Sequence, residues 1–296
     1  MKVIEGIYCR IYSFIVMLIL ICKDKNTLYV YMWPHIGDVC NAMAYLKAYR
    51  EQNNLNDITL LIKKQNYELC SSYIGTFEKV VFFNEKKLFK LSKSRFVIKF
   101  LKKIKVPIEK HFICTTPFLF DERLLHSEEI TTGLITRRVI YNLKGEVKPE
   151  FPVMPKVDSD MYNEFCKNDK NVILSPYANS ANEIKLSFWE DLSKVLVSKG
   201  YDVYTNATKD REVITGTKRL ECSIIELLAY AEKADVCIAL RSGMLDLIAG
   251  CSCKKIVIYN DYEFPELYNL SAWNNNSNLF QIYGEPSVEK VMELLS

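Results

Sequence analysis

Short apolar runs alternate with longer amphipathic segments through residues 171–260. Apolar runs predict strands at 171–174, 202–205, 236–240 and 255–259. The segments between them predict helices, and two of these begin with the Ser-x-x-Glu pattern of a capping box, at 187–190 and 223–226. Gly200 follows the first helix, where a left-handed residue commonly ends one. This alternation predicts a parallel sheet that is covered by helices on both faces.

The amino-terminal half shows the same alternation. We expect strands at 27–32, 58–62, 80–83 and 112–115. Prolines 149, 152 and 155 then cluster where helix and strand signals are few, which predicts a linker. The fold class expected is therefore α/β, with two Rossmann-like parallel-sheet domains facing a cleft. We expect an apolar segment at 1–25, domains at 26–150 and 156–285, and a final helix at 286–296.

Composition narrows the class of protein. The 296 residues are 49% hydrophobic, enough for two cores, and the net charge of +3 is too small to imply nucleic acid. Ten cysteines occur without a Cys-x-x-Cys pair or a neighbouring His to complete a zinc site. The sequence therefore indicates a reducing cytosol and no structural metal.

Two segments bear on membrane contact. Residues 11–22 form an uncharged apolar run of twelve residues, shorter than the about 20 that cross a bilayer as a helix. Three interpretations remain open: a helix in or on the membrane surface, a buried core element, and a signal anchor. Residues 86–105 hold nine Lys or Arg and no acid, interleaved with Leu, Ile and Phe. This pattern suits an anionic membrane surface or an ordinary surface helix; nucleic acid is the least favoured partner, because no binding motif accompanies the charge.

Three segments, in this order along the chain, resemble a known family. They are Ile36-Gly37-Asp38, the stretch Leu-Ser-Pro-Tyr-Ala-Asn-Ser at 174–180 with Lys185 and Trp189 after it, and Arg-Ser-Gly-Met-Leu-Asp at 241–246. Their order and spacing resemble the GT-B glycosyltransferases, and among them the heptosyltransferase-like group that builds bacterial lipopolysaccharide and related glycans. The layout matches over about 156–280, and in the amino-terminal half only near Gly37-Asp38.

The chain also departs from that family's pattern. Arg241 stands where the family has an acid, and Asp246 stands where it has a His. The loop at Tyr177 lacks the family's Gly, and the amino-terminal apolar segment is additional. The donor sugar is therefore left open among heptose, hexose, deoxyhexose and amino sugar.

The resemblance implies a hexosyl- or heptosyl-type glycosyltransferase. Such an enzyme moves a sugar from a nucleotide-sugar donor to a glycan or lipid-linked acceptor, here in bacterial surface polysaccharide biosynthesis such as lipopolysaccharide or capsule. It implies inverting chemistry without metal or other cofactor. An acceptor at the inner face of the plasma membrane would explain the basic segment 86–105 and the apolar run 11–22, so we expect a cytoplasmic protein with peripheral contact to anionic lipid. The resemblance also implies a last helix that crosses back to the amino-terminal domain. Two alternatives are a sugar-nucleotide epimerase or hydrolase of the same fold and a non-catalytic nucleotide-sugar-binding subunit.

Sugar transfer needs a base for the acceptor hydroxyl. Asp38 is the first candidate, because it follows the first strand on a compact Gly-Asp loop, and the resemblance implies the same role. The alternative is that Asp38 caps the next helix. His35 is the other candidate base, or else a surface or packing residue.

Transfer also needs stabilisation of the departing diphosphate. Ser242 and Gly243 open a helix whose free N–H groups suit phosphate, and Arg241 adds a permanent charge unless it pairs with Asp246 or Asp235. Asp246 in turn is expected to bind sugar hydroxyls or to hold Arg241. Lys185 either reaches the phosphates or is solvated.

The remaining candidates are polar residues at strand ends, where parallel sheets bind ligands. Ser175, Asn179 and Ser180 bond the diphosphate or sugar, or else shape an ordinary turn. Thr205 is expected to border the nucleoside, and Trp189 to lie in the core. Asp158-Ser159-Asp160 resembles the metal-binding pattern of other sugar transferases, but its place at a helix start favours capping.

Overall fold

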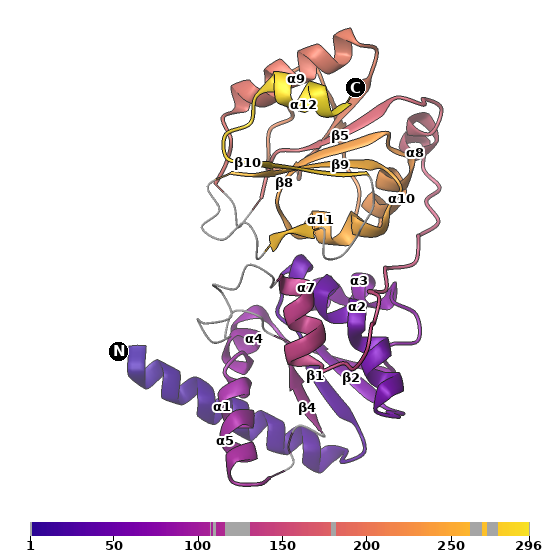
Figure 1. Cartoon of the computed structure of the whole chain (residues 1–296). Coiled ribbons are helices and arrows are strands. Elements are labelled where there is room, and N and C mark those ends of the chain that lie inside the picture. The colour runs from indigo at the N-terminus through magenta and orange to yellow at the C-terminus, as the bar shows by residue number, and fades with distance from the viewer. Residues whose placement is uncertain are drawn as a thin grey trace. The chain divides into compact units, whose positions relative to one another are not determined.

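The computed structural model describes residues 2–106, 108, 111–115, 131–178, 182–260, 268–270 and 278–295. The chain divides into two compact units, which we call unit 1 (Met1–Pro152) and unit 2 (Val153–Ser296). Each contains a parallel sheet with helices on both faces, so the protein is α/β with two Rossmann-like domains, as predicted (Figure 1).

Unit 1 is built on a four-stranded parallel sheet in the order β3-β2-β1-β4. The strands are β1 (Leu28–Tyr31), β2 (Ile58–Ile62), β3 (Lys79–Phe82) and β4 (Phe112–Cys114). Its helices are α1 (Lys2–Lys23), α2 (Ile36–Gln52), α3 (Tyr67–Ser71), α4 (Glu85–Leu91), α5 (Ser94–Lys103) and α7 (Thr132–Ile135), with the 3-10 turn η1 (Lys64–Asn66) before α3 and the π-helical turn η4 (Thr136–Ile140) after α7. Helices α1, α4 and α5 share a hydrophobic core with one face of the sheet, which holds Met17, Leu88, Leu101, Tyr31 and Phe112.

Helix α1 packs on unit 1 along one side only. Cys9, Ser13, Met17 and Leu20 recur every three or four residues and are buried. Ser13 Oγ donates to the carbonyl of Lys90 at 2.8 Å, which ties α1 to α4. The stretch Ile4–Lys23 is long and apolar enough to cross a membrane by length and composition, and only 22% of it is buried. The interpretation of residues 11–22 as a buried core element holds for one side of α1 alone, because the apolar side chains of its other side are exposed.

Unit 2 is built on a six-stranded parallel sheet in the order β10-β9-β8-β5-β6-β7. The strands are β5 (Asn171–Ser175), β6 (Asp202–Asn206), β7 (Lys218–Leu220), β8 (Val236–Leu240), β9 (Lys254–Tyr259) and β10 (Leu279–Tyr283). The helices are α8 (Asp160–Phe165), α9 (Leu186–Ser198), α10 (Glu226–Lys233), α11 (Gly243–Leu247) with the 3-10 turn η5 (Ile248–Gly250), and α12 (Val288–Leu295). Helices α9 and α12 cover one face of this sheet, and α10 and α11 the other (Figure 1).

Helix α12 packs within unit 2. Val291 is fully buried in the core that also holds Trp189 and Leu192 of α9. The Lys254 ammonium donates to the carbonyl of Leu294 at 3.2 Å. The expected crossing of the last helix to the amino-terminal domain is therefore wrong, because its apolar face is already buried against α9. Trp189 is a core residue, as predicted.

One of the two predicted capping boxes forms. The Ser223 amide donates to Glu226 Oε2 at 2.7 Å, and the Glu226 amide donates to Ser223 Oγ at 3.2 Å. The box at Ser187 is absent, because the N-cap of α9 is Lys185, two residues before Ser187. Glu190 instead accepts a hydrogen bond from Thr215 Oγ1 at 2.8 Å.

Candidate functional site

The main candidate site in unit 2 lies where its strand order reverses. From β5 the chain continues to β6 on one side, while β8 lies on the other side, and Ser175 pairs in register with Ala239. The loops after β5 and β8 therefore begin side by side at the carboxyl ends of their strands. Open parallel sheets bind ligands in the crevice at such a switch point. The predicted residues Ser175, Ser242 and Gly243 stand at this position.

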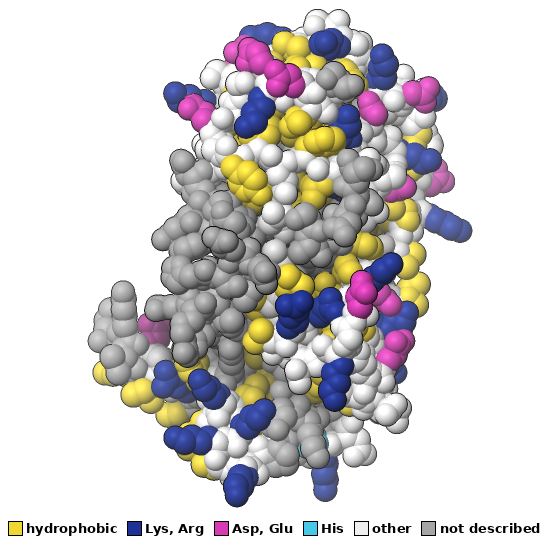
Figure 2. Space-filling model, viewed as in Figure 1, with side chains coloured by type: hydrophobic (Ala, Val, Ile, Leu, Met, Phe, Trp, Pro, Cys, Tyr) yellow, Lys and Arg dark blue, Asp and Glu magenta, His cyan; other side chains and the backbone are white. Residues whose placement is uncertain are grey.

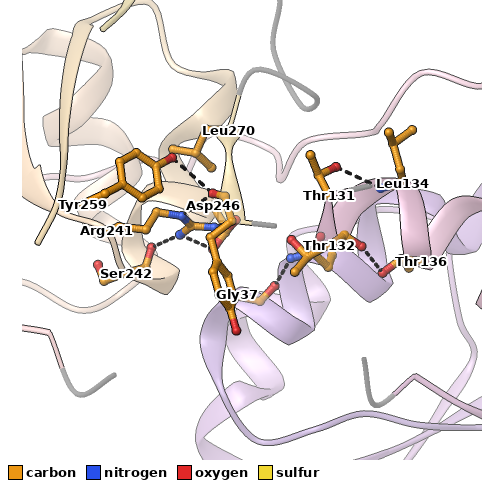
Figure 3. A network of polar contacts seen from close by, with 12 residues as sticks. Gly37, Thr131, Thr132, Leu134, Thr136, Arg241, Ser242, Asp246, Tyr259 and Leu270 are labelled. Carbon is orange, nitrogen blue, oxygen red and sulfur yellow. Dashed lines mark hydrogen bonds and ion pairs between the residues drawn. The ribbon is translucent and has the colours of Figure 1, made fainter. Parts of the chain in front are cut away.

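Arg241 and Asp246 form a buried ion pair in this loop. The guanidinium of Arg241 donates to both carboxylate oxygens of Asp246 at 2.8 Å, as Figure 3 shows. The two side chains are only 5% and 3% exposed. Arg241 also donates to the carbonyls of Ser242 at 2.6 Å and Tyr268 at 2.8 Å. The sequence left each residue either a ligand contact or an ion pair, and the structure contains the ion pair. Asp246 holds Arg241, and Arg241 fixes the backbone at the start of α11.

A second layer of polar contacts supports this loop. Tyr259 Oη donates to Gln281 Oε1 at 2.7 Å and lies 3.2 Å from the carbonyl of Tyr268. Burial raises the pKa of Tyr259, so the phenol keeps its proton and remains a donor. The segment 268–270 is thus bonded to β9, to β10 and to Arg241.

Two of the predicted donor-site hydroxyls are engaged in the sheet. Thr205 is fully buried, and its Oγ1 lies 2.5 Å from Thr217 Oγ1 and accepts from the Ile214 amide at 3.3 Å. Thr205 therefore has no surface for a nucleoside, and its neighbour Asn206 is the polar side chain of β6 near the switch point. The Asn206 amide donates to Ser175 Oγ at 3.2 Å, so these two residues form one polar patch at the ends of β5 and β6.

The loop after β5 leads from this patch to α9. Lys185 is exposed at the start of α9, where its charge is available to a ligand. The Asn260 amide, after β9, donates to the carbonyl of Asn182 at 3.4 Å, which places the loop near the end of β9 as well. Asn179 and Ser180 lie outside the described residues.

The unit 1 site also lies at a reversal of strand order. The strand β1 pairs with β2 on one side and with β4 on the other, and Tyr31 pairs with Cys114. The loop that follows β1 carries His35 and leads into α2. It is held by Asn66, which donates to the carbonyl of Pro34 at 3.0 Å, and by Asn41, which donates to the carbonyl of Gly37 at 2.8 Å.

The two candidate bases differ in their setting. Asp38 is half-buried and is the third residue of α2, where a carboxylate interacts favourably with the helix N-terminus. The expectation that Asp38 is the N-cap residue is wrong, because His35 occupies that position. His35 is exposed, and its ring stacks on Trp33 with centroids 5.9 Å apart.

Among the described residues, no group of three or more His, Cys, Asp or Glu is placed to hold a metal ion. Asp158-Ser159-Asp160 opens α8, with Ser159 Oγ accepting from the Tyr162 amide at 3.2 Å. This motif acts as a helix start, as predicted.

Sequence reasoning missed the residues that hold the two loops. Asn41 and Asn66 are both 5% exposed and bond to backbone carbonyls rather than to solvent. The spacing of Asn41 four residues after Gly37 is the one signal that points to such a bond, because residues four apart share a helix face. Asn66 and Tyr268 are distant in sequence from the loops they hold, and no local pattern indicates them.

Comparisons with known proteins identify the fold. No family model and no curated protein matches the chain. Among solved structures, the E. coli ADP-heptose LPS heptosyltransferase II aligns with a TM-score of 0.60 at 12% identity, over 91% of this chain and 97% of that one. A glycosyl transferase family 9 protein from Veillonella parvula aligns with 0.60 at 13% identity, over 91% and 90% of the two chains. E. coli heptosyltransferase WaaC, solved with ADP, aligns with 0.57 at 12% identity, over 91% and 98%. The fold is therefore the GT-B fold of heptosyltransferase-like proteins, as the sequence motifs suggested.

Proposed function

We propose that the protein is a glycosyltransferase that moves a sugar from a nucleotide-sugar donor to a glycan or lipid-linked acceptor in bacterial surface polysaccharide biosynthesis. The observation that carries this proposal is the pairing of two polar loops with the two switch points of a GT-B fold. Both loops lie where parallel sheets bind ligands.

Unit 2 is the proposed donor side. Its fold is shared with WaaC, which has been solved with ADP and with ADP-2-deoxy-2-fluoro heptose. Ser175, the backbone N–H groups at Ser242-Gly243 and the exposed Lys185 supply donors and positive charge for a diphosphate, together with Asn179 and Ser180 of the intervening loop. The ion pair of Arg241 and Asp246 fixes the loop that carries Ser242 and Gly243.

Unit 1 is the proposed acceptor side. Asp38 takes the proton from the acceptor hydroxyl as that oxygen attacks the anomeric carbon, and the nucleoside diphosphate leaves. A single displacement of this kind inverts the anomeric centre. Positive charge at Lys185 and backbone N–H groups stabilise the leaving diphosphate, so the step needs no metal. His35 stands three residues before Asp38 and is the second base candidate.

The enzyme is further proposed to work at the cytoplasmic face of the plasma membrane. Helix α1 exposes Ile4, Ile7, Ile11 and Ile19, which are 51–74% exposed, and α5 exposes Phe96 and Phe100. Figure 2 shows Lys and Arg side chains gathered over the region of α1, α4 and α5 with hydrophobic side chains beside them. An apolar face flanked by cations suits a bilayer with anionic lipid. All ten cysteines are free thiols, which fits a reducing compartment.

Nucleotide binding is the first test of the donor side. The full-length protein is heated with UDP, GDP, ADP, CDP and their common sugar conjugates, without added metal. A ligand at 100 times its dissociation constant stabilises the fold by about 2.7 kcal/mol, which shifts the melting temperature measurably. Lys185→Gln should weaken the responding nucleotide about tenfold, the loss of one charged contact. Lys194→Gln on the same helix, whose lysine pairs with Asp191, is the matched control and should bind normally.

Two outcomes would count against a transferase. No response from the whole panel would contradict a nucleotide-sugar donor site. Consumption of the donor sugar at full rate without any acceptor would instead indicate the epimerase or hydrolase.

A further inference from the structure

Unit 1 contains a cavity of about 680 Å³ beside the loop that carries His35. Three elements form it: α1, α4 and the loop after β1. Its principal side chains are Tyr8, Trp33, His35, Lys86, Phe89 and Lys90. A cavity with aromatic walls and a few fixed polar groups is the usual form of a small-molecule site.

The aromatic wall is continuous. Trp33 stacks on His35 on one side and lies 6.1 Å from the Phe89 ring centroid on the other. Phe89 is 48% exposed, so its ring is available to a ligand rather than used for the core. Flat apolar surfaces of this kind pack against the carbon face of a sugar ring.

Lys90 is held in place at the cavity. Its ammonium lies 4.7 Å from the ring centroid of Tyr8 and 5.3 Å from that of Tyr12, and it donates to Tyr8 Oη at 3.2 Å. These contacts fix the position of the charge before any ligand arrives. Lys86, one helical turn earlier, adds a second cation on the same face of α4.

Two acids also line the cavity, Glu5 and Glu85. Glu85 accepts from the Lys63 ammonium at 2.8 Å, and this bond lowers the pKa of Glu85. Its charge is thus matched by a lysine that does not itself line the cavity. Glu5 lies in the first turn of α1. With Glu85 paired to Lys63, the two lysines that line the cavity outnumber this remaining acid.

The cavity adjoins the apolar face of α1. Tyr8 lines the cavity, while Ile4, Ile7 and Ile11, within one turn of it, are exposed. A ligand that enters at Tyr8 therefore meets cations and aromatic rings at one end and exposed aliphatic side chains at the other. The matching molecule is an anionic amphiphile with a sugar at its polar end.

We infer that the cavity formed by α1, α4 and the loop after β1 binds the head of a lipid-linked saccharide that carries a phosphate group, with Lys86 and Lys90 on the phosphate and Trp33 and Phe89 against the sugar. That this molecule is the sugar acceptor rests on the proposed function; that the cavity binds it does not.

Binding is measured by calorimetry on the full-length protein, without any nucleotide sugar. The probes are dodecyl phosphate below its micelle concentration, dodecyl maltoside and inorganic phosphate. Dodecyl phosphate should bind most tightly. Lys86→Gln with Lys90→Gln should weaken it at least tenfold. Phe89→Ala should weaken dodecyl maltoside severalfold and change dodecyl phosphate less, because only the maltoside carries a sugar. Lys102→Gln with Lys103→Gln removes two exposed cations of α5 that do not line the cavity and should leave the affinity unchanged.

Each other result overturns the inference. Equal binding of inorganic phosphate would make this a free-phosphate site, and equal binding of dodecyl maltoside would make it an apolar groove only. Equal losses in the two lysine pairs would assign the effect to general surface charge. Unchanged melting temperatures show that the variants fold. If the protein transfers sugar and the cavity variants bind dodecyl phosphate normally, the inferred role of the cavity is overturned and the proposed function stands. If the cavity binds dodecyl phosphate as expected but the protein transfers no sugar, the proposed function is overturned and the inferred role of the cavity stands.

Discussion

At the residue scale, some polar side chains of the candidate site are engaged within the fold and others lie at the ends of strands and helices. Arg241, the strongest sequence candidate for phosphate contact, is paired with Asp246 and bonded to two carbonyls. Thr205 is likewise engaged within the sheet. Lys185 is exposed, Ser175 accepts from Asn206 at the end of β5, and Asp38 lies in the first turn of the helix after β1.

Asp38→Asn should lower the rate of sugar transfer by a factor of about 10² to 10⁴ while nucleotide binding stays intact. A general base contributes about that much, and the amide cannot accept the proton. Initial rates and calorimetric nucleotide affinities measure the two effects. Glu51→Gln, near the other end of the same helix, is the control and should transfer at the normal rate. A normal rate in Asp38→Asn would remove Asp38 from the mechanism and favour His35.

Arg241→Gln and Asp246→Asn should each lower the free energy of unfolding by about 3–5 kcal/mol, because each leaves a buried polar partner without its ion pair. The double variant should lose less than the sum of the two, as expected for directly interacting residues. Urea unfolding measures all three. Additive losses below about 1 kcal/mol each would show that the pair does not hold the loop.

At the element scale, the starts of α9 and α10 show that the same sequence pattern forms a capping box in one helix and not in the other. Ser223-x-x-Glu226 and Ser187-x-x-Glu190 are the same pattern, yet only the first forms a capping box. The N-cap of α9 lies two residues before Ser187, and Glu190 bonds to Thr215, which lies far away in sequence. A tertiary contact therefore decides the second case, and no local pattern contains it.

Ser223→Ala should lower the free energy of unfolding by about 1 kcal/mol, since the Glu226 amide loses its side-chain cap. Ser187→Ala should have almost no effect, because its hydroxyl caps nothing in α9. Paired thermal denaturation of the two variants measures the difference. Equal losses would mean that both boxes form in solution.

The basic helix α5 provides the element-scale test of membrane contact. Lys102→Gln with Lys103→Gln should weaken binding to vesicles that contain phosphatidylglycerol about 30-fold, because each lysine near an anionic surface contributes about 1 kcal/mol. The control pair, Lys199→Gln with Lys233→Gln in unit 2, removes the same charge and should bind normally. Co-sedimentation measures both. Equal binding to neutral and anionic vesicles would contradict this role.

At the scale of the whole molecule, the alternation of strands and helices was sufficient to predict two parallel sheets and most of their strands. Strands β7 and β10 were missed. Lys218 and Arg219 leave β7 without an apolar run, and Gln281 interrupts the apolar positions of β10. The extent of α1 was also missed, since an apolar run of twelve residues does not show that Lys2–Lys23 form one helix with a single buried side. The position of α12 depends on packing against α9. The prediction that it crosses to the amino-terminal domain, which came from the family resemblance, was wrong.

The candidate site was likewise predicted in part. Strand order, and hence the switch points, could not be predicted from a linear pattern, but the polar residues at strand ends were found by it. The cavity beside His35 was not foreseen, because it requires α1, α4 and the loop after β1 to meet. Its lysines were noted only as a charged segment.

The measurement that most directly tests the central claim is sugar transfer itself. The purified full-length protein is incubated with its responding nucleotide sugar and lipid-extracted glycan acceptors, and the products are followed by mass spectrometry. We predict a gain of one sugar residue on a lipid-linked acceptor, with release of one nucleoside diphosphate for each transfer and loss of both signals in Asp38→Asn. Tight nucleotide binding without any transfer across the acceptor panel would contradict the account and identify the chain as a nucleotide-sugar-binding subunit.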